Sequence, residues 1–189
     1  MKIIGFTGTS GTGKTTLAEE LKKRYPDLIN VCNEGTRYAA KQIGFEKMTD
    51  CPKDKFYEFE QLLVQNHLYN ITHNDKPILI TDRTIYDIYV YTMTSSKIPD
   101  SFKDYMHLLC QSMTKSKIYD SIVYFPVIDV DLNDGFRSEN KYRYKTLDYT
   151  LNGVFNEFDV SIMSYSKEST LEERIDQFII YYVDGVILK

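Results

Sequence analysis

The chain has 189 residues, of which 42% are hydrophobic and 26% are charged, and its formal net charge is -4. These values are typical of a globular protein and exclude a disordered or fibrous chain, and the length predicts a single domain over residues 1–189. The acidic balance, without a long run of basic residues, argues against a broad surface for duplex nucleic acid but leaves room for a local basic patch.

The cysteines and the apolar runs indicate where in the cell the protein is expected. Cys32, Cys51 and Cys110 are far apart, odd in number and lack metal-binding spacing, so we expect buried free thiols in a reducing environment. No run approaches the roughly 18 apolar residues of a membrane span, and the apolar start of the sequence is too short for a signal peptide. We therefore expect a cytoplasmic protein without a membrane partner, and the oligomeric state is left open, a homodimer included.

Strands and helices alternate along the predicted chain. Residues 2–7 are expected to form a buried strand, followed by a glycine-rich loop and a helix from about residue 14 to 24. Short apolar runs at 28–32, 77–81, 121–125 and 158–163 predict four further strands. Helical apolar faces are predicted at 56–63, 102–113 and 171–182. This alternation predicts an α/β fold with a parallel sheet covered on both faces.

The start of the last predicted helix can be placed more closely. Ser169 and Glu172 have the spacing of a capping box, in which each side chain bonds the backbone of the other residue. The sequence therefore predicts that this helix begins at about residue 170.

The glycine-rich loop carries the strongest signal. Residues 8–15, GTSGTGKT, match GxxxxGK[ST] at every fixed position, after a predicted strand and at the start of a predicted helix. Glycines let backbone N–H groups face a phosphate, and the helix N-terminus adds partial positive charge. We expect Lys14 to reach the β- and γ-phosphates of ATP and Thr15 to bind Mg²⁺, whereas the alternative is a simple glycine turn. The expected nucleotide-binding residues are Gly8, Thr9, Ser10, Gly11, Thr12, Gly13, Lys14, Thr15 and Thr16.

Charged residues follow the second predicted strand, where ligands bind in open α/β sheets. Glu34 is a candidate general base toward an acceptor hydroxyl. Arg37, one helical turn further, is a candidate for binding an acceptor phosphate or carboxylate. The alternative is a capped helix with an exposed ion pair between these two residues.

A second charged pair follows the third predicted strand. Asp82 is a candidate ligand for Mg²⁺, and Arg83 is a candidate clamp for an anionic group of the acceptor. The alternative is that Asp82 caps the next helix and that Arg83 lies on the surface. Whether Glu34 or Asp82 acts as the general base stays open at this point.

The polar segment 129–147 is predicted to form a lid. Arg137 and Arg143 are the preferred site residues in it, because a guanidinium fork fits phosphate and a closing lid excludes water. A solvated charged helix is the alternative. Tyr86, Tyr89 and Tyr91 could stack on a base, or could simply pack in the core.

These motifs give the sequence its resemblance to a known family. GTSGTGKTT, NEGTRYAA (33–40), ITDRTIYD (80–87) and NDGFR (133–137) are similar to segments of the P-loop nucleoside and nucleotide kinases. The branch with the ribosylnicotinamide kinase domain of the bacterial NAD regulator is the most similar, beside thymidylate kinase. The resemblance covers essentially the whole chain and implies a three-layer fold, a five-stranded parallel sheet of order 2-3-1-4-5, ATP·Mg²⁺ as donor and an arginine-bearing lid between strands 4 and 5.

The sequence therefore predicts an ATP-dependent kinase. The expected acceptor is a nucleoside, a nucleoside monophosphate or a related small molecule, with Arg37 and Arg83 orienting it. Two alternatives remain: a nucleotide-binding switch or regulatory ATPase that acts through a protein partner, and a kinase acting on a nucleotide within a nucleic acid. The acidic net charge disfavours the second alternative, but the basic lid keeps it open.

Overall fold

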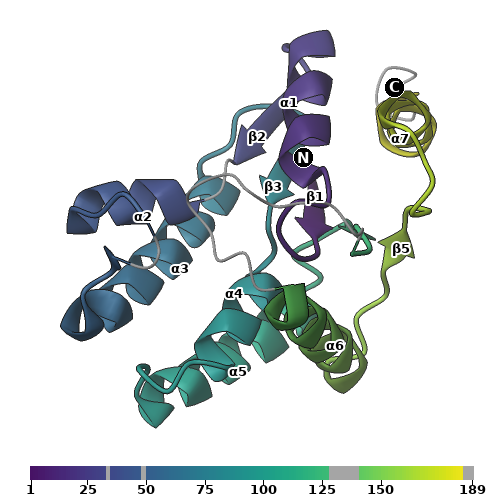
Figure 1. Cartoon of the computed structure of the whole chain (residues 1–189). Helices are drawn as coiled ribbons and strands as arrows, with labels where there is room; N and C mark the ends of the chain where they lie inside the picture. The colour runs from purple at the N-terminus through teal and green to yellow at the C-terminus, as the bar shows by residue number, and fades with distance from the viewer. Residues whose placement is uncertain (33–34, 48–49, 128–140, 185–189) are drawn as a thin grey trace.

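A computed structural model describes residues 1–32, 35–47, 50–127 and 141–184. At its centre lies a parallel sheet of the order β2-β3-β1-β4-β5, as the resemblance implied (Figure 1). The strands are β1 (Lys2–Thr7), β2 (Ile29–Cys32), β3 (Ile78–Asp82), β4 (Ser121–Tyr124) and β5 (Met163–Ser164).

The register brings the ends of these strands together. In the central strand β1, Phe6 is paired with Asp82 of β3, and Thr7 is paired with Tyr124 of β4. Cys32, the last residue of β2, is paired with Thr81. Because parallel strands end at the same edge, the residues that follow β1, β2 and β3 gather at one edge of the sheet.

Alternate residues of the strands face two separate cores. Ile3 and Leu79 belong to one apolar cluster, whereas the neighbouring Ile4 and Ile80 belong to another. This period of two is the geometry of a strand, and both of its faces are buried here. The prediction of a sheet covered on both faces is confirmed.

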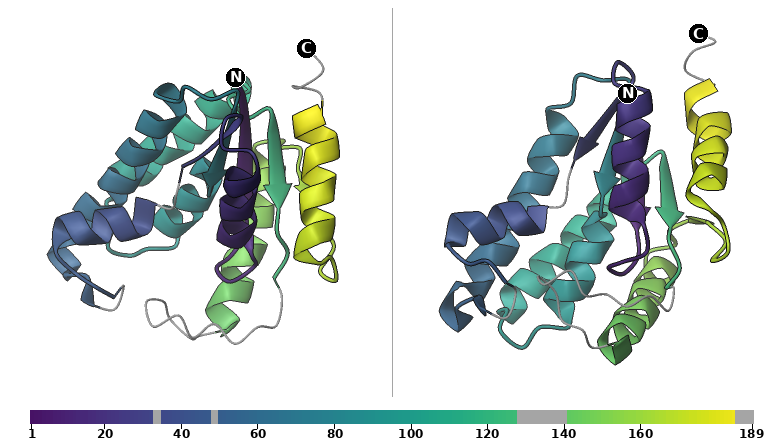
Figure 2. Two further views of the ribbon diagram at one scale, coloured as in Figure 1. Left: turned by 90° about the horizontal axis from the view of Figure 1, so that it is seen from above. Right: turned by 45° about the horizontal axis from the view of Figure 1, so that its top comes forward.

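Four of the described helices cover the first face, and they lie together on one side of the sheet in Figures 1 and 2. They are α3 (Phe56–Thr72), α4 (Ile85–Met93), α5 (Asp100–Lys115) and α6 (Lys141–Glu157). The first turn of α4 is fixed by a capping box between Thr84 and Asp87. Asp82 is therefore not the cap of this helix.

The second face is covered by α1 (Lys14–Arg24) and by α7 (Leu171–Phe178) with its π-helical continuation η3 (Ile179–Val183), which stand on the opposite side of the sheet (Figure 2). The capping box of α7 is formed by Thr170 and Glu173. The predicted pair, Ser169 and Glu172, is thus wrong by one residue: the Ser169 hydroxyl bonds the backbone of Ser166 instead.

The fifth strand is shorter and later than predicted. α6 continues to Glu157, and the buried Phe158 packs against Tyr89 of α4. Asp159 then adopts a φ of 53°, the left-handed conformation that commonly ends a helix. The strand that pairs with β4 is Met163–Ser164, so it overlaps the predicted strand 158–163 only at Met163.

A smaller cluster joins the remaining elements. α2 (Gly35–Ile43) and the 3-10 turn η2 (Lys53–Lys55) pack beside α3, with Ala39, Ala40, Cys51 and Phe59 buried between them. Cys32, Cys51 and Cys110 are all buried and none of them forms a disulfide, as expected. Within the described residues, no helix has the length and apolar character needed to cross a membrane.

Candidate active site

The glycine-rich loop connects β1 to α1 and requires glycine at several positions. Gly8, Gly11 and Gly13 have φ angles of 127°, 78° and 91°, which side chains rarely allow. A Cβ atom on Gly8 would lie 2.4 Å from the backbone oxygen of Phe125, so no side chain fits there at all. The loop is thus held tightly between the ends of β1 and β4.

Lys14 begins α1 and turns back into the loop. Its Nζ donates hydrogen bonds to the backbone oxygens of Gly8 at 2.8 Å and Thr9 at 2.6 Å, and to Thr12 Oγ1 at 3.1 Å. The side chain is buried, so its charge acts in surroundings of low polarity. An ammonium group at the mouth of a glycine loop is arranged to bind an anion.

Thr15 and Asp82 meet although they come from different elements. The Thr15 hydroxyl on α1 donates a hydrogen bond of 2.5 Å to the Asp82 carboxylate at the end of β3. Asp82 is only 4% exposed. Burial, together with the smaller effect of the Asp82 charge, raises the pKa of the neighbouring Cys32 thiol to about 12. The paired oxygens of Thr15 and Asp82 lie where the sequence predicted a metal site.

The donor set of this pair fits Mg²⁺. Carboxylate and hydroxyl oxygens are hard ligands, and Mg²⁺ commonly takes only one or two protein oxygens beside phosphate and water oxygens. Among the described residues no group of three or more histidine, cysteine or acidic side chains forms a complete metal cage. The two oxygens of Thr15 and Asp82 could hold such a cation together with phosphate oxygens.

Arg83 occupies a strained position beside Asp82. Its φ of 134° lies in a region that favours glycine, so the backbone stores strain at this residue. The guanidinium lies 5.1 Å from the centre of the Tyr91 ring, and Nη2 donates to Ser10 Oγ at 3.4 Å. The strained turn thus aims a cation toward the glycine loop.

Asp87 holds this region together, and the sequence analysis did not identify it. Its buried carboxylate accepts hydrogen bonds from Thr7 Oγ1 at 2.8 Å and from the Gly8 N–H at 3.2 Å, both where β1 runs into the loop. It also accepts from the N–H of Thr84 at 2.8 Å and its hydroxyl at 2.6 Å. One carboxylate therefore joins the start of the glycine loop to the turn that carries Arg83.

Glu60 is a second residue that sequence reasoning missed. It lies on α3, is 2% exposed, and accepts a long hydrogen bond of 3.4 Å from Thr92 of α4. Burial raises the pKa of Glu60 to about 8, against the opposing effects of this bond and of the Arg83 charge. The sequence of α3 does not indicate a role for Glu60. Its connection to the site is apparent only from its position near Arg83 in the fold.

Two cavities meet at Asp82 and Arg83. One of about 200 Å³ is lined by Ser10, Gly11 and residues 13–16 of the loop and helix start, together with Asp82 and Arg83. A smaller one is lined by Asp82, Arg83 and residues of α2, α3 and α4 such as Gly35, Asn66 and His67. The carboxylate and the arginine therefore stand between the phosphate-binding loop and a second space.

The second cavity has a neutral polar wall. His67 is buried, and burial lowers its pKa to about 4, in spite of the Asp87 charge. Its Nε2 lies 2.6 Å from the hydroxyl of Tyr119, which also accepts the N–H of Ile85. Through Tyr119, His67 therefore helps to position the first turn of α4.

The other predicted site residues are distributed unevenly. Arg37 lies on α2 and Arg143 on α6, both on the protein surface. Glu34, Arg137 and the predicted lid as far as residue 140 lie outside the described residues. Residues 141–147, predicted as part of that lid, form the first two turns of α6.

α6 also brings a carboxylate toward the loop. Tyr124 donates a 2.6 Å hydrogen bond to Asp148. Burial raises the pKa of Asp148, while that bond and the charges of Lys167 and Lys14 oppose the shift. Lys14 therefore has an acidic side chain within electrostatic reach.

The predicted aromatic platform is mostly core. Tyr86 and Tyr89 are 2% and 3% exposed and pack with Phe158, so neither can stack on a ligand base. Tyr91 is half-buried beneath Arg83. The tyrosines of α4 thus support the site and do not line it.

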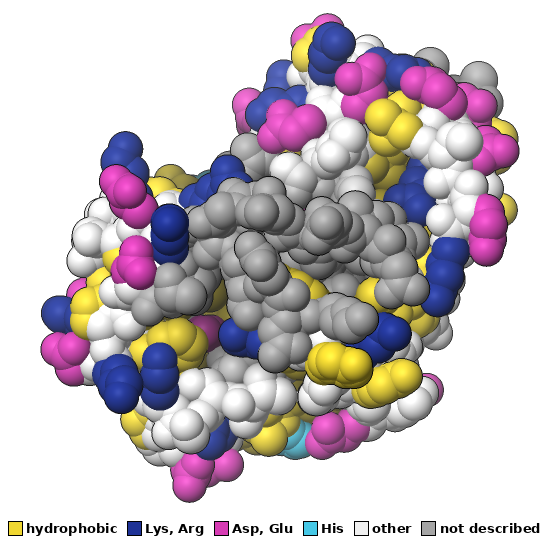
Figure 3. Space-filling view, viewed as in Figure 1, with side chains coloured by type: hydrophobic (Ala, Val, Ile, Leu, Met, Phe, Trp, Pro, Cys, Tyr) yellow, Lys and Arg dark blue, Asp and Glu magenta, His cyan; other side chains and the backbone are white. Residues whose placement is uncertain are grey.

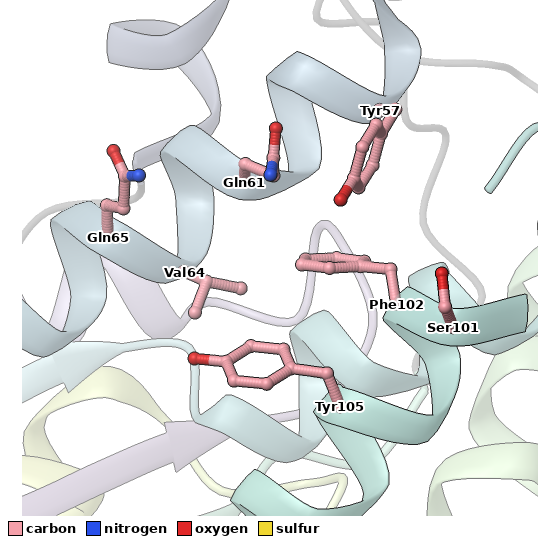
Figure 4. A pocket seen from close by; sticks show the side chains of 7 residues that line it. All are labelled: Tyr57, Gln61, Val64, Gln65, Ser101, Phe102 and Tyr105. Atoms are coloured by element: carbon pink, nitrogen blue, oxygen red, sulfur yellow. The ribbon is translucent and has the colours of Figure 1, made fainter. Parts of the chain in front are cut away.

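In the part of the chain that the structure describes, the surface charge and the pockets outside the glycine-loop region give no further candidate for the active site. On the face shown in Figure 3, basic and acidic side chains alternate around the described rim, and no broad basic surface is formed by the residues described there. A separate pocket of about 320 Å³ lies between α3 and α5, where Figure 4 shows Gln61, Phe102 and Tyr105 around it. Tyr105, which lies within the apolar helical face predicted at 102–113, is 46% exposed. This pocket has no charged lining and lies apart from the loop.

Solved structures of similar fold include a deoxyadenosine kinase and two proteins with bound nucleotides. Deoxyadenosine kinase from M. mycoides, with the products dCMP and dCDP bound, matches with a TM-score of 0.63 at 14% identity, over 97% of this chain and 99% of that one. NadR in complex with NAD and AMP-PNP matches with a TM-score of 0.70 at 16% identity, over 95% of this chain and 49% of that one. YorR from Bacillus subtilis matches with a TM-score of 0.58 at 14% identity, over 100% of this chain and 99% of that one.

Comparison of the sequence with known proteins and families identifies a family but no individual curated relative. No curated protein matches the sequence significantly. The family described as AAA domain matches residues 3–174, from the first strand to the first turn of α7. With the fold of P-loop nucleoside and nucleotide kinases and a glycine loop closed by Lys14, the chain belongs to the AAA domain family.

Proposed function

We propose that this protein is an ATP-dependent kinase that transfers the γ-phosphoryl group to a nucleoside, a nucleoside monophosphate or a related small molecule. The observation that carries the proposal is the place of Asp82 and Arg83, which line both the cavity over the glycine loop and the neighbouring one. The second cavity, of about 30 Å³, would have to widen to admit an acceptor on the far side of the same two side chains.

The donor side follows from the loop. The phosphates of ATP would replace the backbone oxygens of Gly8 and Thr9 as partners of the Lys14 ammonium. The buried hydroxyl of Thr9 has no hydrogen-bond partner among the described residues, which fits a loop built to meet a further polar group. The remaining loop residues, from Ser10 to Thr16, would surround the phosphates.

Mg²⁺ would be held by Thr15 and Asp82 together with phosphate oxygens, and would neutralise charge on the phosphates when bound. Thr15 would contribute its hydroxyl oxygen, and Asp82 its carboxylate. Their existing hydrogen bond places both oxygens close together before any ligand enters. This pre-organisation supports their assignment as the metal ligands.

Arg83 would orient the acceptor. Its strained backbone and its contacts with Tyr91 and Ser10 fix the guanidinium at the boundary of the two cavities. A guanidinium there would stabilise the negative charge that spreads over the transferred oxygens. Arg37 from α2, and Arg137 and Arg143 from the segment 129–147, would complete this positive environment as the acceptor binds and the lid closes.

The general base depends on the acceptor. A hydroxyl acceptor must lose a proton, whereas a monophosphate acceptor is already anionic. Because the Asp82 carboxylate is engaged by Thr15, Glu34, two residues after β2, is the better candidate for a base. The structure titled deoxyadenosine kinase, with the products dCMP and dCDP bound, supports an acceptor of the nucleoside or nucleotide class.

The direct test is a product assay. The protein, residues 1–189, is incubated with ATP·Mg²⁺ and nucleosides, nucleoside monophosphates, ribosylnicotinamide or oligonucleotides, and each acceptor is analysed by mass. We expect a mass increase of one phosphoryl group on a small-molecule acceptor. ADP release without any phosphorylated acceptor would favour the switch or ATPase, and a phosphorylated oligonucleotide would favour the nucleic-acid kinase.

A variant separates the acceptor classes. Glu34→Gln should lower turnover of a nucleoside by on the order of a hundredfold, because the base is lost, and should leave a monophosphate acceptor nearly unaffected. The matched control is Glu19→Gln on the exposed face of α1, which should change neither rate. Full turnover of a nucleoside by the Glu34 variant would exclude Glu34 as the base.

A further inference from the structure

Arg174 is a buried cation packed against the outer side of the glycine loop. It lies on α7, is 7% exposed, and its Nη1 donates a hydrogen bond of 3.1 Å to the backbone oxygen of Thr12. A Cβ atom on Gly13 would lie 3.2 Å from the same nitrogen. The guanidinium lies 5.5 Å from the ring centres of both Phe125 and Tyr165. The arginine is therefore fixed against the Thr12–Gly13 peptide group.

The other contacts of Arg174 are all with neutral oxygens. Nε donates to Ser169 Oγ at 2.9 Å, and Nη2 donates to the Ser166 backbone oxygen at 3.3 Å. Within the described part of the chain no carboxylate forms an ion pair with it. Burial lowers the pKa of Arg174, which shows that this environment disfavours the charge. A buried arginine is normally paired with an acidic group.

The peptide geometry links this charge to a bound anion. In a trans peptide the C=O and N–H groups point to opposite sides. Arg174 holds the Thr12 C=O from outside the loop, so the Gly13 N–H of the same peptide group points the other way, where the loop would hold phosphate. A hydrogen bond from a cation to a carbonyl polarises the peptide and makes its N–H a stronger donor.

We propose that Arg174 is a positioning residue for the nucleotide phosphates: it fixes and polarises the Thr12–Gly13 peptide group, and so strengthens the hydrogen bond from the Gly13 N–H to a bound polyphosphate. This inference rests on the proposed ATP site in the same loop. It assigns a part of the phosphate site to Arg174 of α7, 162 positions after Thr12 of the glycine loop.

The attachment of α7 does not require this charge. Arg24, on α1, donates two hydrogen bonds to Glu172 at 2.9 Å and 2.6 Å and so joins α1 to α7 on the surface. Ile175 and Phe178 bury the apolar face of α7 in the second core. Other contacts thus join α7 to α1, and the hydrogen bond of Arg174 to Thr12 links α7 to the glycine loop.

The experiment measures binding of ATP and of inorganic tripolyphosphate by calorimetry, each with Mg²⁺, to the full chain and its variants. Arg174→Met should weaken both ligands about tenfold or more, because a charge-assisted hydrogen bond is lost behind the phosphate site. Arg174→Lys keeps the charge and should retain most of the affinity. Arg24→Met, which breaks the other link between α1 and α7, should bind both ligands as the unchanged protein does.

The outcomes are distinct. Equal losses of affinity in Arg174→Met and Arg174→Lys would show that packing matters and not charge, which would overturn the inference. Unchanged affinity in Arg174→Met would overturn it as well, while the proposed kinase would stand. If the unchanged protein binds neither ATP nor tripolyphosphate, the proposed function fails and this inference with it. Should circular dichroism show Arg174→Met to be unfolded, Arg174→Gln replaces it with the same expected loss.

Discussion

Thr15 and Asp82 are joined by a hydrogen bond of 2.5 Å that links the first helix to the third strand. The two residues are 67 positions apart, and their oxygens form the hard-ligand pair of the proposed Mg²⁺ site. If that assignment holds, the two side chains act on the same cation. Their variants should then share a phenotype.

We expect Asp82→Asn to lower turnover by on the order of a hundredfold and to raise the Mg²⁺ concentration needed for half-maximal rate. Thr15→Val should shift the Mg²⁺ dependence in the same direction, and Thr15→Ser, which keeps the hydroxyl, should not. Initial rates measured across a Mg²⁺ titration at fixed ATP check this. Identical Mg²⁺ dependence in Thr15→Val and the unchanged protein would remove Thr15 from the site.

Asp87→Asn should destabilise the fold. The carboxylate accepts bonds from the Gly8 and Thr84 N–H groups and from two hydroxyls, and an amide would turn an N–H toward one of these donors. A lost acceptor at a buried site costs about 2 kcal/mol in free energy of unfolding. Urea unfolding measures this, with Asp104→Asn on the exposed side of α5 as the control that should change little. Equal stability of both variants would contradict the role given to Asp87.

The backbone at Arg83 predicts an inverted order of stability. At ordinary helical positions alanine is more stable than glycine, but at a φ of 134° glycine should be more stable than alanine by roughly 1 kcal/mol. Arg83→Gly should therefore unfold at higher urea than Arg83→Ala, while both lose kinase activity. At Glu19, an exposed position inside α1, the same two replacements should show the usual order. The usual order at both sites would mean that Arg83 is not strained.

Glu60 predicts a pH dependence of stability. Its pKa is raised to about 8 in the folded protein from an ordinary 4.5, so the folded state keeps a proton that the unfolded chain loses. The stabilising contribution is complete below pH 4.5 and falls as pH rises toward 8, by at most about 1.4 kcal/mol per pH unit. Glu60→Gln should lack this decline. Unfolding free energies from pH 5 to 8 test it, and parallel curves for the two proteins would refute it.

The nucleotide loop could be predicted because its signal is local, whereas the order of the sheet came only from the resemblance to a known family. Gly8, Gly13, Lys14 and Thr15 lie within eight positions, and their spacing alone describes a phosphate cradle. Asp82 and Arg83 follow an unbroken apolar strand, so their place at the sheet edge could be inferred from the chain order.

Other residues could not be found because their role depends on distant partners. Asp87 looks like an ordinary residue in the first turn of a helix until the fold brings Thr7 to it from 80 positions away. Arg174 lies among charged neighbours in a helical pattern and reads as a surface residue. In both cases the information lies in the tertiary contacts and not in any local pattern.

Two errors in element limits have physical causes. Both Ser169 with Glu172 and Thr170 with Glu173 fit the capping pattern, and only the extended backbone of Thr170 selects the second pair. The apolar character of Phe158 led to the prediction that a strand begins there. Phe158 instead follows the end of α6 and packs against Tyr86 and Tyr89 of α4. The strand that follows has only two residues, too few to show a period.

The contacts of Lys14 have a consequence for selectivity among anions. Its ammonium group is already bonded to two backbone oxygens and one hydroxyl of its own loop, so any entering anion competes with these internal partners. A single sulfate or phosphate offers few extra contacts in return, whereas a polyphosphate also reaches the loop amides and the helix N-terminus. Because the internal hydrogen bonds of Lys14 must be replaced, binding is favourable only for ligands that make many further contacts. The loop therefore selects long, highly charged polyphosphates over small anions.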